Sequence, residues 1–380
     1  MLSEIRDLLP WGIEHRRHLH RYPELGRQEF KTSTYCHEQM AALGYDIRSS
    51  FETGLVADLT VPGATRTIAF RADMDALPAQ ELGDATYKSC HDGVAHLCGH
   101  DVHMSIALTA ACYLAGKRDQ LTSNIRFIFQ PDEEGVGGAQ GMIADGVMDG
   151  VDEIYALHND PSLEVGQIRL KTGIMSAALT QFELKITGKS AHGTTPHQGL
   201  DALSESVRIY QQLDHIRMRK ISPFSPALLM IGELKAGEAC NIIAPEANLT
   251  GTVRSFDNTV QETLLREIRS LLQESEQRGF GIEFTTGGCP AIHNSEYAVS
   301  RVMKAGRAVL ASENIITMPE PWPASEDFSD FTAVQQGALF LLGSGNASKG
   351  INQPLHANPF DVDEDCIAYG AAIFAQLAMS

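Results

Sequence analysis

A cluster of possible metal ligands lies in the segment from His96 to His103. It reads His-Leu-Cys-Gly-His-Asp-Val-His, which places one thiol, three imidazoles and a carboxylate within eight residues. A single glycine separates Cys98 from His100, and because glycine lets the backbone bend, both side chains can reach one metal ion. His96 and His103 suit a supporting role better than a ligand role. A ligand histidine usually needs a hydrogen-bonding partner of its own, and Asp101 can also be such a partner.

Three later positions can complete such a site. Two adjacent glutamates, Glu133 and Glu134, follow an apolar run that ends in Gln-Pro-Asp, and His158 and His356 each follow a short apolar run of their own. Cysteine, histidine and glutamate together are a suitable ligand set for a borderline divalent ion. Because consecutive side chains diverge, one glutamate can bind the ion while the other acts as a general base. The combination predicts metal-assisted hydrolysis.

Other polar residues suggest supporting and substrate-binding roles. Asp73 and Asp75 follow an apolar strand candidate, and either can orient a ligand imidazole, although a turn or helix cap is an alternative. A later polar segment contributes imidazole, amide and guanidinium groups, which can bind a carboxylate and a developing oxyanion. These groups belong to His192, His197, Asn241 and Arg254. A loop with no special role explains them equally well at this point.

Composition bounds the class of protein. The 380 residues are 43% hydrophobic and 21% charged, which is typical of a globular protein with two domains. The net charge of −18 is spread along the chain and disfavours nucleic acid or anionic membranes as partners. No 18-residue apolar run and no secretory signal are evident. The seven cysteines are scattered and odd in number, so we expect a reducing compartment, the cytoplasm.

Two different orders of helices and strands along the chain predict two α/β domains. In the first, helices at 1–45 and 103–115 alternate with strands at 56–59, 67–70 and 125–129, which predicts a sheet that is at least partly parallel. A strand–helix–strand–strand–helix–strand order follows, which is the ferredoxin-like pattern. Its elements are expected at 181–187, 201–216, 228–234, 247–255, 261–278 and 281–286. We therefore predict one domain from 1–178 and 291–380, with 179–290 inserted as a second.

The ordered set of motifs resembles the M20 metallopeptidases, in their amidohydrolase and aminoacylase branch. The resemblance covers nearly the whole chain. It is carried by Arg17-His-Leu-His20, Pro23-Glu-Leu-Gly26, Glu29, Arg71-Ala-Asp-Met-Asp-Ala-Leu-Pro78, Cys98-Gly-His-Asp101, Gln130-Pro-Asp-Glu-Glu-Gly135, Leu157-His158, Pro196-His197, Asn241-Ile-Ile, Gly251-Thr-Val-Arg254, Ser325-Glu-Asp-Phe328 and Leu355-His356.

The resemblance implies a fold, a reaction and residue roles. The fold would be a zinc-peptidase-like α/β domain with a mixed sheet, plus an inserted ferredoxin-like lid that forms a homodimer or a dimer-based oligomer. The reaction would be hydrolysis of N-acyl amino acids to a carboxylic acid and a free amino acid. Two divalent metal ions would activate water, with Zn²⁺ the first expectation and Mn²⁺, Co²⁺ or Ni²⁺ also suitable. Their ligands would be Cys98, His100, Glu134, His158 and His356.

The same resemblance assigns the remaining roles. Glu133 would be the general base and His192 the oxyanion donor. Asn241, Arg254 and His197 would bind substrate, and we place Asp73 and Asp101 in support of the ligands. Three departures from the branch stand out: Asp132 where alanine is usual, Ser190-Ala-His192 in the lid loop, and Asn159 where an apolar residue usually follows the histidine.

Several alternatives stay open on the sequence. Within the class, an N-acetyldiaminopimelate deacetylase, a dipeptidase and a carboxypeptidase all fit. From another class, a catalytically idle metal- or ligand-binding protein has the same scaffold, although an intact Glu133 argues against it. A redox or thiol-storage protein fails on spacing, because no Cys-x-x-Cys pair is present.

Overall fold

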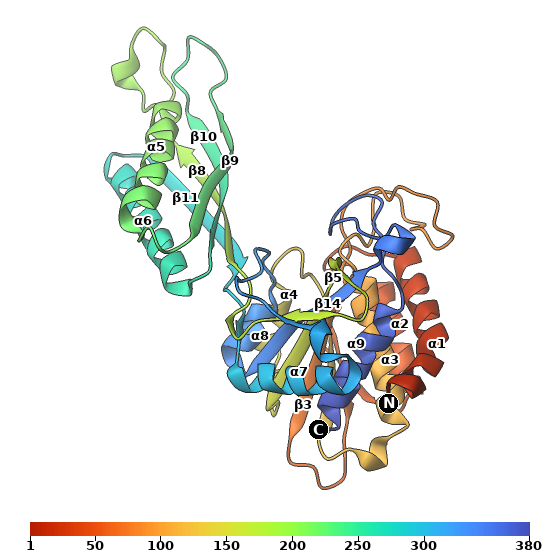
Figure 1. The fold of residues 1–380 in the computed structure, drawn as a ribbon. Helices are drawn as coiled ribbons and strands as arrows, with labels where there is room; N and C mark the ends of the chain where they lie inside the picture. Colours follow the sequence, from red (N-terminus) through yellow and green to blue (C-terminus); the bar gives the residue numbers. More distant parts are fainter. The chain divides into compact units, whose positions relative to one another are not determined.

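The computed structural model describes residues 1–380 and divides into two compact units (Figure 1). Unit 1 comprises Met1–Met175, Ile292–Glu320 and Asp327–Ser380, and unit 2 comprises Ser176–Ala291 and Pro321–Glu326. The sequence predicted an insertion at 179–290, without the short second segment of unit 2. That segment joins unit 2 through backbone contacts, in which Ser176 bridges Trp322 and Ala177 N donates to Ala324 O at 3.0 Å.

Unit 1 is built on an eight-stranded mixed sheet in the order β1-β2-β4-β3-β5-β14-β6-β13. Its strands are β1 (Asp46–Ser49), β2 (Leu55–Leu59), β3 (Thr67–Asp73), β4 (Asn124–Gln130), β5 (Glu153–Glu164), β6 (Ile168–Leu170), β13 (Ile315–Thr317) and β14 (Gly337–Gly345). A separate small ribbon pairs β7 (Gly173–Ile174) with β12 (His293–Asn294). The mixed α/β fold predicted for this part of the chain is confirmed.

Helices cover both faces of this sheet. They are α1 (Leu2–Arg21), α2 (Phe30–Ala42), α3 (His100–Ala115), α4 (Gly138–Ala144), α7 (Glu296–Val309), α8 (Phe328–Val334) and α9 (Cys366–Ala378). Short 3₁₀ turns lie at η1 (Arg118–Gln120), η3 (Ser312–Asn314) and η4 (Ala347–Lys349). Helices α3 and α9 are apolar nearly all round, so they form the inner layer, and α1 packs over both of them. Helices α4 and α8 pack together on the other face.

The sheet and the inner helices share an aromatic core. The Phe70 ring lies 4.8 Å from the Phe374 ring of α9 and 5.5 Å from the Phe127 ring of β4, centroid to centroid. Strands β4 and β5 both run parallel to β3, and Asp73 is in register with Gln130. Their carboxyl ends therefore meet at one edge of the sheet, where open α/β sheets usually place their functional groups.

Unit 2 has a four-stranded antiparallel sheet in the order β11-β8-β10-β9. Its elements are β8 (Ala178–Thr187), η2 (Pro196–Gln198), α5 (Ala202–Lys220), β9 (Ala227–Ala236), β10 (Glu246–Ser255), α6 (Asn258–Gln277) and β11 (Gly281–Cys289). Aspartate side chains cap both helices, Asp201 at α5 and Asp257 at α6, by accepting backbone N–H groups of the first turn. This is the predicted ferredoxin-like order of elements.

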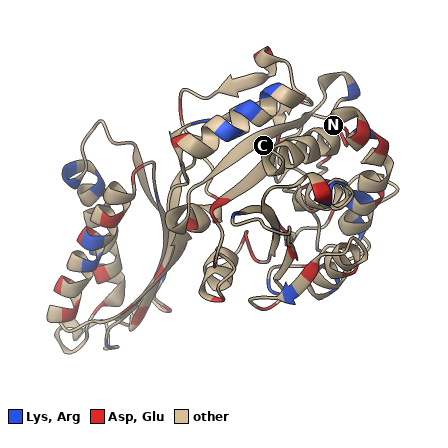
Figure 2. Ribbon diagram, turned by 90° about the horizontal axis from the view of Figure 1, so that it is seen from below, with Lys and Arg blue, Asp and Glu red and all other residues tan.

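Charge and hydropathy are unremarkable along the elements. Figure 2 shows basic and acidic positions interspersed along the helices, including those of unit 2. None of the helices combines the length and apolar character that spanning a membrane requires.

Candidate metal centre

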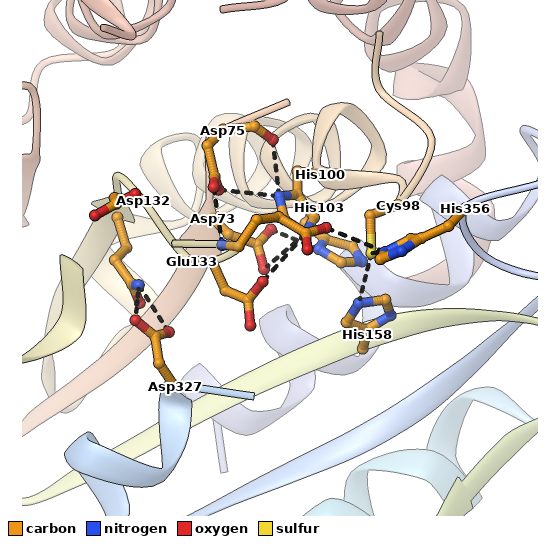
Figure 3. Close-up of polar contacts among 12 residues, drawn as sticks. Asp73, Asp75, Cys98, His100, His103, Asp132, Glu133, His158, Asp327 and His356 are labelled. Carbon is orange, nitrogen blue, oxygen red and sulfur yellow. Dashed lines mark hydrogen bonds and ion pairs between the residues drawn. The ribbon is translucent and has the colours of Figure 1, made fainter. Parts of the chain in front are cut away.

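The structure brings all five predicted ligand side chains into one cluster. Figure 3 shows Cys98, His100, His158 and His356 lying together. The Cys98 Sγ atom lies 3.5 Å from His158 Nε2 and 3.3 Å from His356 Nε2. Ligand atoms of Cys98, His100 and His158 form one close group, and those of Cys98, Glu134 and His356 form a second. Cys98 belongs to both groups, so its thiol links them.

His158 presents one nitrogen to the cluster. It lies in β5, and its Nδ1 donates to the Asn159 carbonyl oxygen at 2.8 Å, so Nε2 faces Cys98. Burial, together with the neighbouring His103, lowers the pKa of His158 to about 3. The imidazole is therefore neutral near pH 7, as a metal ligand has to be.

His100 is fixed at the first position of α3. Its Nδ1 is 2.9 Å from the Asp75 carbonyl oxygen and 3.2 Å from Asp75 Oδ1, while its buried Nε2 has no hydrogen-bond partner. An unpartnered buried nitrogen is costly, and a metal ion would satisfy it. Gly99, directly before it, has φ +90°, and a Cβ there would collide with the Asn159 side chain. Glycine is thus required between Cys98 and His100.

The two adjacent glutamates point to different parts of the cluster. Glu134 Oε1 is 3.2 Å from His356 Nε2, whereas Glu133 Oε2 is 3.9 Å from His100 Nε2. Glu134 N also donates to Asp75 Oδ2 at 2.9 Å. A thiol, three imidazoles and a carboxylate, with an unpartnered nitrogen among them, fit divalent metal ions well.

Asp73 and Asp75 divide the supporting work. Asp75 holds His100, whereas Asp73 lies 2.6 Å from His103 Nδ1 and 2.6 Å from Arg71 Nη1. The other nitrogen of His103, Nε2, accepts the Asn159 backbone N–H at 2.9 Å, so both of its nitrogens are used. His103 therefore supports β5 beside His158 and has no nitrogen left for an ion.

Asp101 does not touch a ligand side chain in the contacts of the structure. Its Oδ2 lies 2.8 Å from Arg16 Nε and 2.9 Å from His20 Nδ1. The expected support of the ligands is thus supplied by Asp75, a residue that the sequence marked only as one of two possibilities. Arg16 and His20 lie in α1, and Asp101 is the second residue of α3. These contacts therefore anchor α1 to the start of α3.

The predicted oxyanion donor and the predicted substrate-binding residues all lie in unit 2. His192 and Asn241 are exposed, and a β-bridge between His192 and Ile242 holds their two loops side by side. His192 Nδ1 accepts the Thr194 N–H at 3.2 Å, which leaves the proton on Nε2 as a donor. Arg254 donates to Ser325 Oγ at 3.0 Å. The remaining residue, His197, is exposed in η2.

A network of polar contacts centred on Arg71, called the hub below, lies beside the cluster and was not predicted from the sequence. Buried Arg71 donates to Gln130 Oε1 at 2.7 Å and to Asp327 Oδ1 at 3.0 Å, in addition to Asp73. The only sequence signal was that Arg71, Gln130 and Asp327 each fall inside a motif. The hub ties the ends of β3 and β4 to the start of α8, and so stiffens the edge of the sheet that carries the cluster.

Cys98→Ala should abolish tight metal binding. Its sulfur belongs to both close groups, and even residues that only support ligands change affinity about 10–100-fold, so we expect a loss above about 100-fold. Burial raises the pKa of the Cys98 thiol, and binding requires the thiolate, so affinity should rise with pH in the wild type. Titration with Zn²⁺ at two pH values measures both effects. Cys90→Ala, at an exposed cysteine, is the control; unchanged affinity in Cys98→Ala contradicts the assignment.

Comparison with known proteins places the chain in a family. Residues 69–380 match the Peptidase family M20/M25/M40. An N-acyl-L-amino acid amidohydrolase of Geobacillus stearothermophilus is 36% identical over 302 residues, covering 78% of this chain and 80% of that protein. Thermostable carboxypeptidase 1 of Saccharolobus solfataricus is 35% identical over 384 residues, covering 99% and 97%.

A solved structure agrees over the full length. The Bacillus subtilis YXEP protein, a dinuclear metal binding peptidase from the M20 family, superposes with a TM-score of 0.81 at 28% identity, covering 98% of each chain. Fold and site together define a metal-binding hydrolase acting on amide bonds. The chain belongs to the M20 peptidase family.

Proposed function

We propose that the protein hydrolyses the amide bond of N-acyl amino acids, with N-acetyl or N-aroyl groups, to a carboxylic acid and a free amino acid. The observation that carries the proposal is the position of Glu133, whose carboxylate groups with His100 and Glu134 but not with Cys98. Glu134 lies with Cys98 and His356, while Glu133, only 7% exposed, lies beside His100 and outside the two thiol-containing groups. A buried carboxylate next to a metal cluster is placed as a general base.

The chain's own residues support each step of the reaction. Bound at Cys98, His100, Glu134, His158 and His356, two divalent ions would supply a water that is nucleophilic at neutral pH and would polarise the amide carbonyl. Glu133 accepts the proton from the attacking water on a carboxylate oxygen and returns it to the leaving amine nitrogen. His192, in unit 2, would donate a hydrogen bond from Nε2–H to the developing oxyanion, a contribution of about 3–4 kcal/mol for one donor. Zinc, manganese, cobalt and nickel all suit the ligands.

Residues of unit 2 are proposed to bind the substrate. Arg254, a guanidinium, suits the α-carboxylate of the amino acid, and Asn241 and His197 offer neutral donors for the carbonyl groups. Unit 2 would then act as a lid that excludes water.

A panel of substrates tests the proposal. Metal-loaded protein is offered N-acetyl and N-benzoyl amino acids, N-acetyldiaminopimelate and C-terminally free dipeptides, and release of amino acid is measured. We expect turnover of N-acyl amino acids to exceed that of dipeptides. Preferred cleavage of N-acetyldiaminopimelate would narrow the function to that deacetylase. No turnover despite stoichiometric metal would instead support a non-catalytic metal- or ligand-binding protein.

Carboxypeptidase activity is the second candidate, and a specific observation favours it. Thermostable carboxypeptidase 1 is 35% identical to this chain over nearly its full length. Both reactions cleave an amide whose amine side becomes a free amino acid, so the same cluster serves either. Faster cleavage of dipeptides than of N-acyl amino acids in the panel would establish it.

We also propose that unit 2 forms a homodimer. Exposed apolar side chains gather on one face of α5, at Leu203, Val207 and Tyr210, which follow helical spacing. The neighbouring edge strand β9 exposes Leu228 and Met230. An unpaired edge strand beside an apolar helix face suits pairing with a second copy.

All seven cysteines are unpaired, which supports the reducing cytoplasm as the compartment.

A further inference from the structure

Three charged residues with unusual backbone conformations meet beside the metal centre. Arg27, Glu52 and Asp132 have φ values of 62°, 52° and 54°, in the left-handed region that residues with a Cβ rarely adopt. Arg27 Nε lies 2.7 Å from Asp132 Oδ2, and Arg27 Nη1 lies 3.6 Å from Glu52 Oε1. Strained backbone of this kind persists only where surrounding contacts hold it. Here the ion pairs among the three side chains are among those contacts.

Asp132 begins the loop that carries the two glutamates. Its N–H donates to buried Glu29 Oε1 at 2.9 Å, which fixes the backbone on one side. Its carboxylate is packed between two glycines, since a Cβ at Gly26 or Gly135 would collide with it. The turn at Asp132 therefore determines the direction in which the next residue, Glu133, leaves the backbone.

We propose that Arg27 is a positioning residue for the reaction: its ion pair with Asp132 holds the left-handed turn that aims Glu133 at the metal centre. The inference rests on the proposed function, because it concerns how the general base is placed. Arg27 touches none of the cluster residues in the contacts of the structure, and it acts through the loop alone.

The Arg27–Asp132 ion pair involves an exposed side chain, so its effect on catalysis can be separated from its effect on folding. The Arg27 side chain is 51% exposed, and ion pairs at such exposure contribute little to stability. Catalysis is far more sensitive, because a misplacement of about 1 Å can cost about 100-fold in rate. Loss of the pair should therefore lower kcat while the unfolding midpoint and metal content stay unchanged.

Arg27→Gln and Asp132→Asn test this with a matched control. We expect each variant to lose about ten-fold in kcat, with KM and bound metal as in the wild type, and Arg27→Lys to recover part of the loss. The control is Asp58→Asn, which breaks the 2.7 Å Asp58–Arg126 pair near the beginning of the same strand, β4. Arg126 lies in β4, the strand that leads into the loop at Asp132, but its pair with Asp58 is remote from that loop. The Asp58→Asn variant should therefore keep the wild-type kcat. Unchanged kcat in Arg27→Gln overturns the inference, as does a loss that appears only together with a lower unfolding midpoint.

Hydrogen exchange gives a readout that does not depend on turnover. Amides of residues 132–138 should exchange faster in Arg27→Gln than in the wild type, with the rest of unit 1 unchanged. Equal exchange in this loop overturns the inference. If the wild type cleaves none of the substrates, the proposed function fails, and the loop exchange still decides whether Arg27 holds the turn.

Discussion

Glu133→Gln should lose activity by at least about 100-fold and up to about 10,000-fold, the range attributed to a positioned general base. The amide keeps the size of the carboxylate but cannot accept the proton from the attacking water. Because Glu133 lies outside the two thiol-containing groups, metal content should stay at the wild-type value. Steady-state turnover of an N-acyl amino acid, paired with metal analysis of the same sample, measures both quantities.

Glu134→Gln is the matched comparison. This neighbouring glutamate lies 3.2 Å from His356 Nε2, so its replacement should weaken metal binding, and added metal should restore part of the activity. Added metal should not restore Glu133→Gln. Wild-type activity in Glu133→Gln, or loss of metal from it, would show that the roles of the two glutamates are wrongly assigned.

Arg16→Met should destabilise the protein by about 3–5 kcal/mol, the cost of breaking a buried ion pair by removing one partner. The Arg16 side chain is fully buried and lies 2.8 Å from Asp101 Oδ2, with Asp361 and Glu364 each at 3.3 Å. Without the guanidinium, the buried Asp101 carboxylate retains only His20 as a partner. Urea denaturation at pH 7 measures the loss.

The adjacent arginine supplies the control. Arg17 contacts the same Glu364, at 2.6 Å, but its side chain is 47% exposed. Exposed pairs contribute about 0–1 kcal/mol, so Arg17→Met should cost no more than that. Equal losses in the two variants would show that burial is not what makes the Arg16 contacts important.

The Arg16 effect should depend on pH with a definite sign. Burial alone would raise the pKa of Asp101, but Arg16 and His20 hold it well below its usual range. A carboxylate with a lowered pKa in the folded state stabilises the protein above its unfolded pKa of about 4, and that stability is lost as the pH falls further. The difference between wild type and Arg16→Met should therefore shrink below about pH 4. A constant difference from pH 7 to pH 3 would contradict this explanation.

Candidate ligands could be predicted from residue types and spacing because the chemistry of metal binding restricts them. Cysteine and histidine two residues apart, adjacent glutamates and isolated histidines after apolar runs are each visible in the chain. The ferredoxin-like order of elements in unit 2 could also be predicted from the sequence, since its strands alternate apolar and polar residues. By contrast, β14 is buried at every position and carries no such alternation, so the sequence did not distinguish it.

Contacts between distant segments could not be predicted. Asp75, two residues past the end of β3, supports His100 in place of Asp101, and no local pattern reveals which carboxylate the fold brings to His100. The Arg27–Asp132 pair joins residues 105 apart in the sequence. Its partners are identified only once the fold brings the two left-handed turns together.

The most direct test of the metal-centred account is a titration of chelator-treated protein with Zn²⁺ or Mn²⁺, with release of amino acid from an N-acyl amino acid as the signal. The account predicts no activity without metal and a rise that reaches its plateau at two equivalents per chain. Activity that persists without metal would contradict it. So would two bound equivalents with no hydrolysis of any amide substrate.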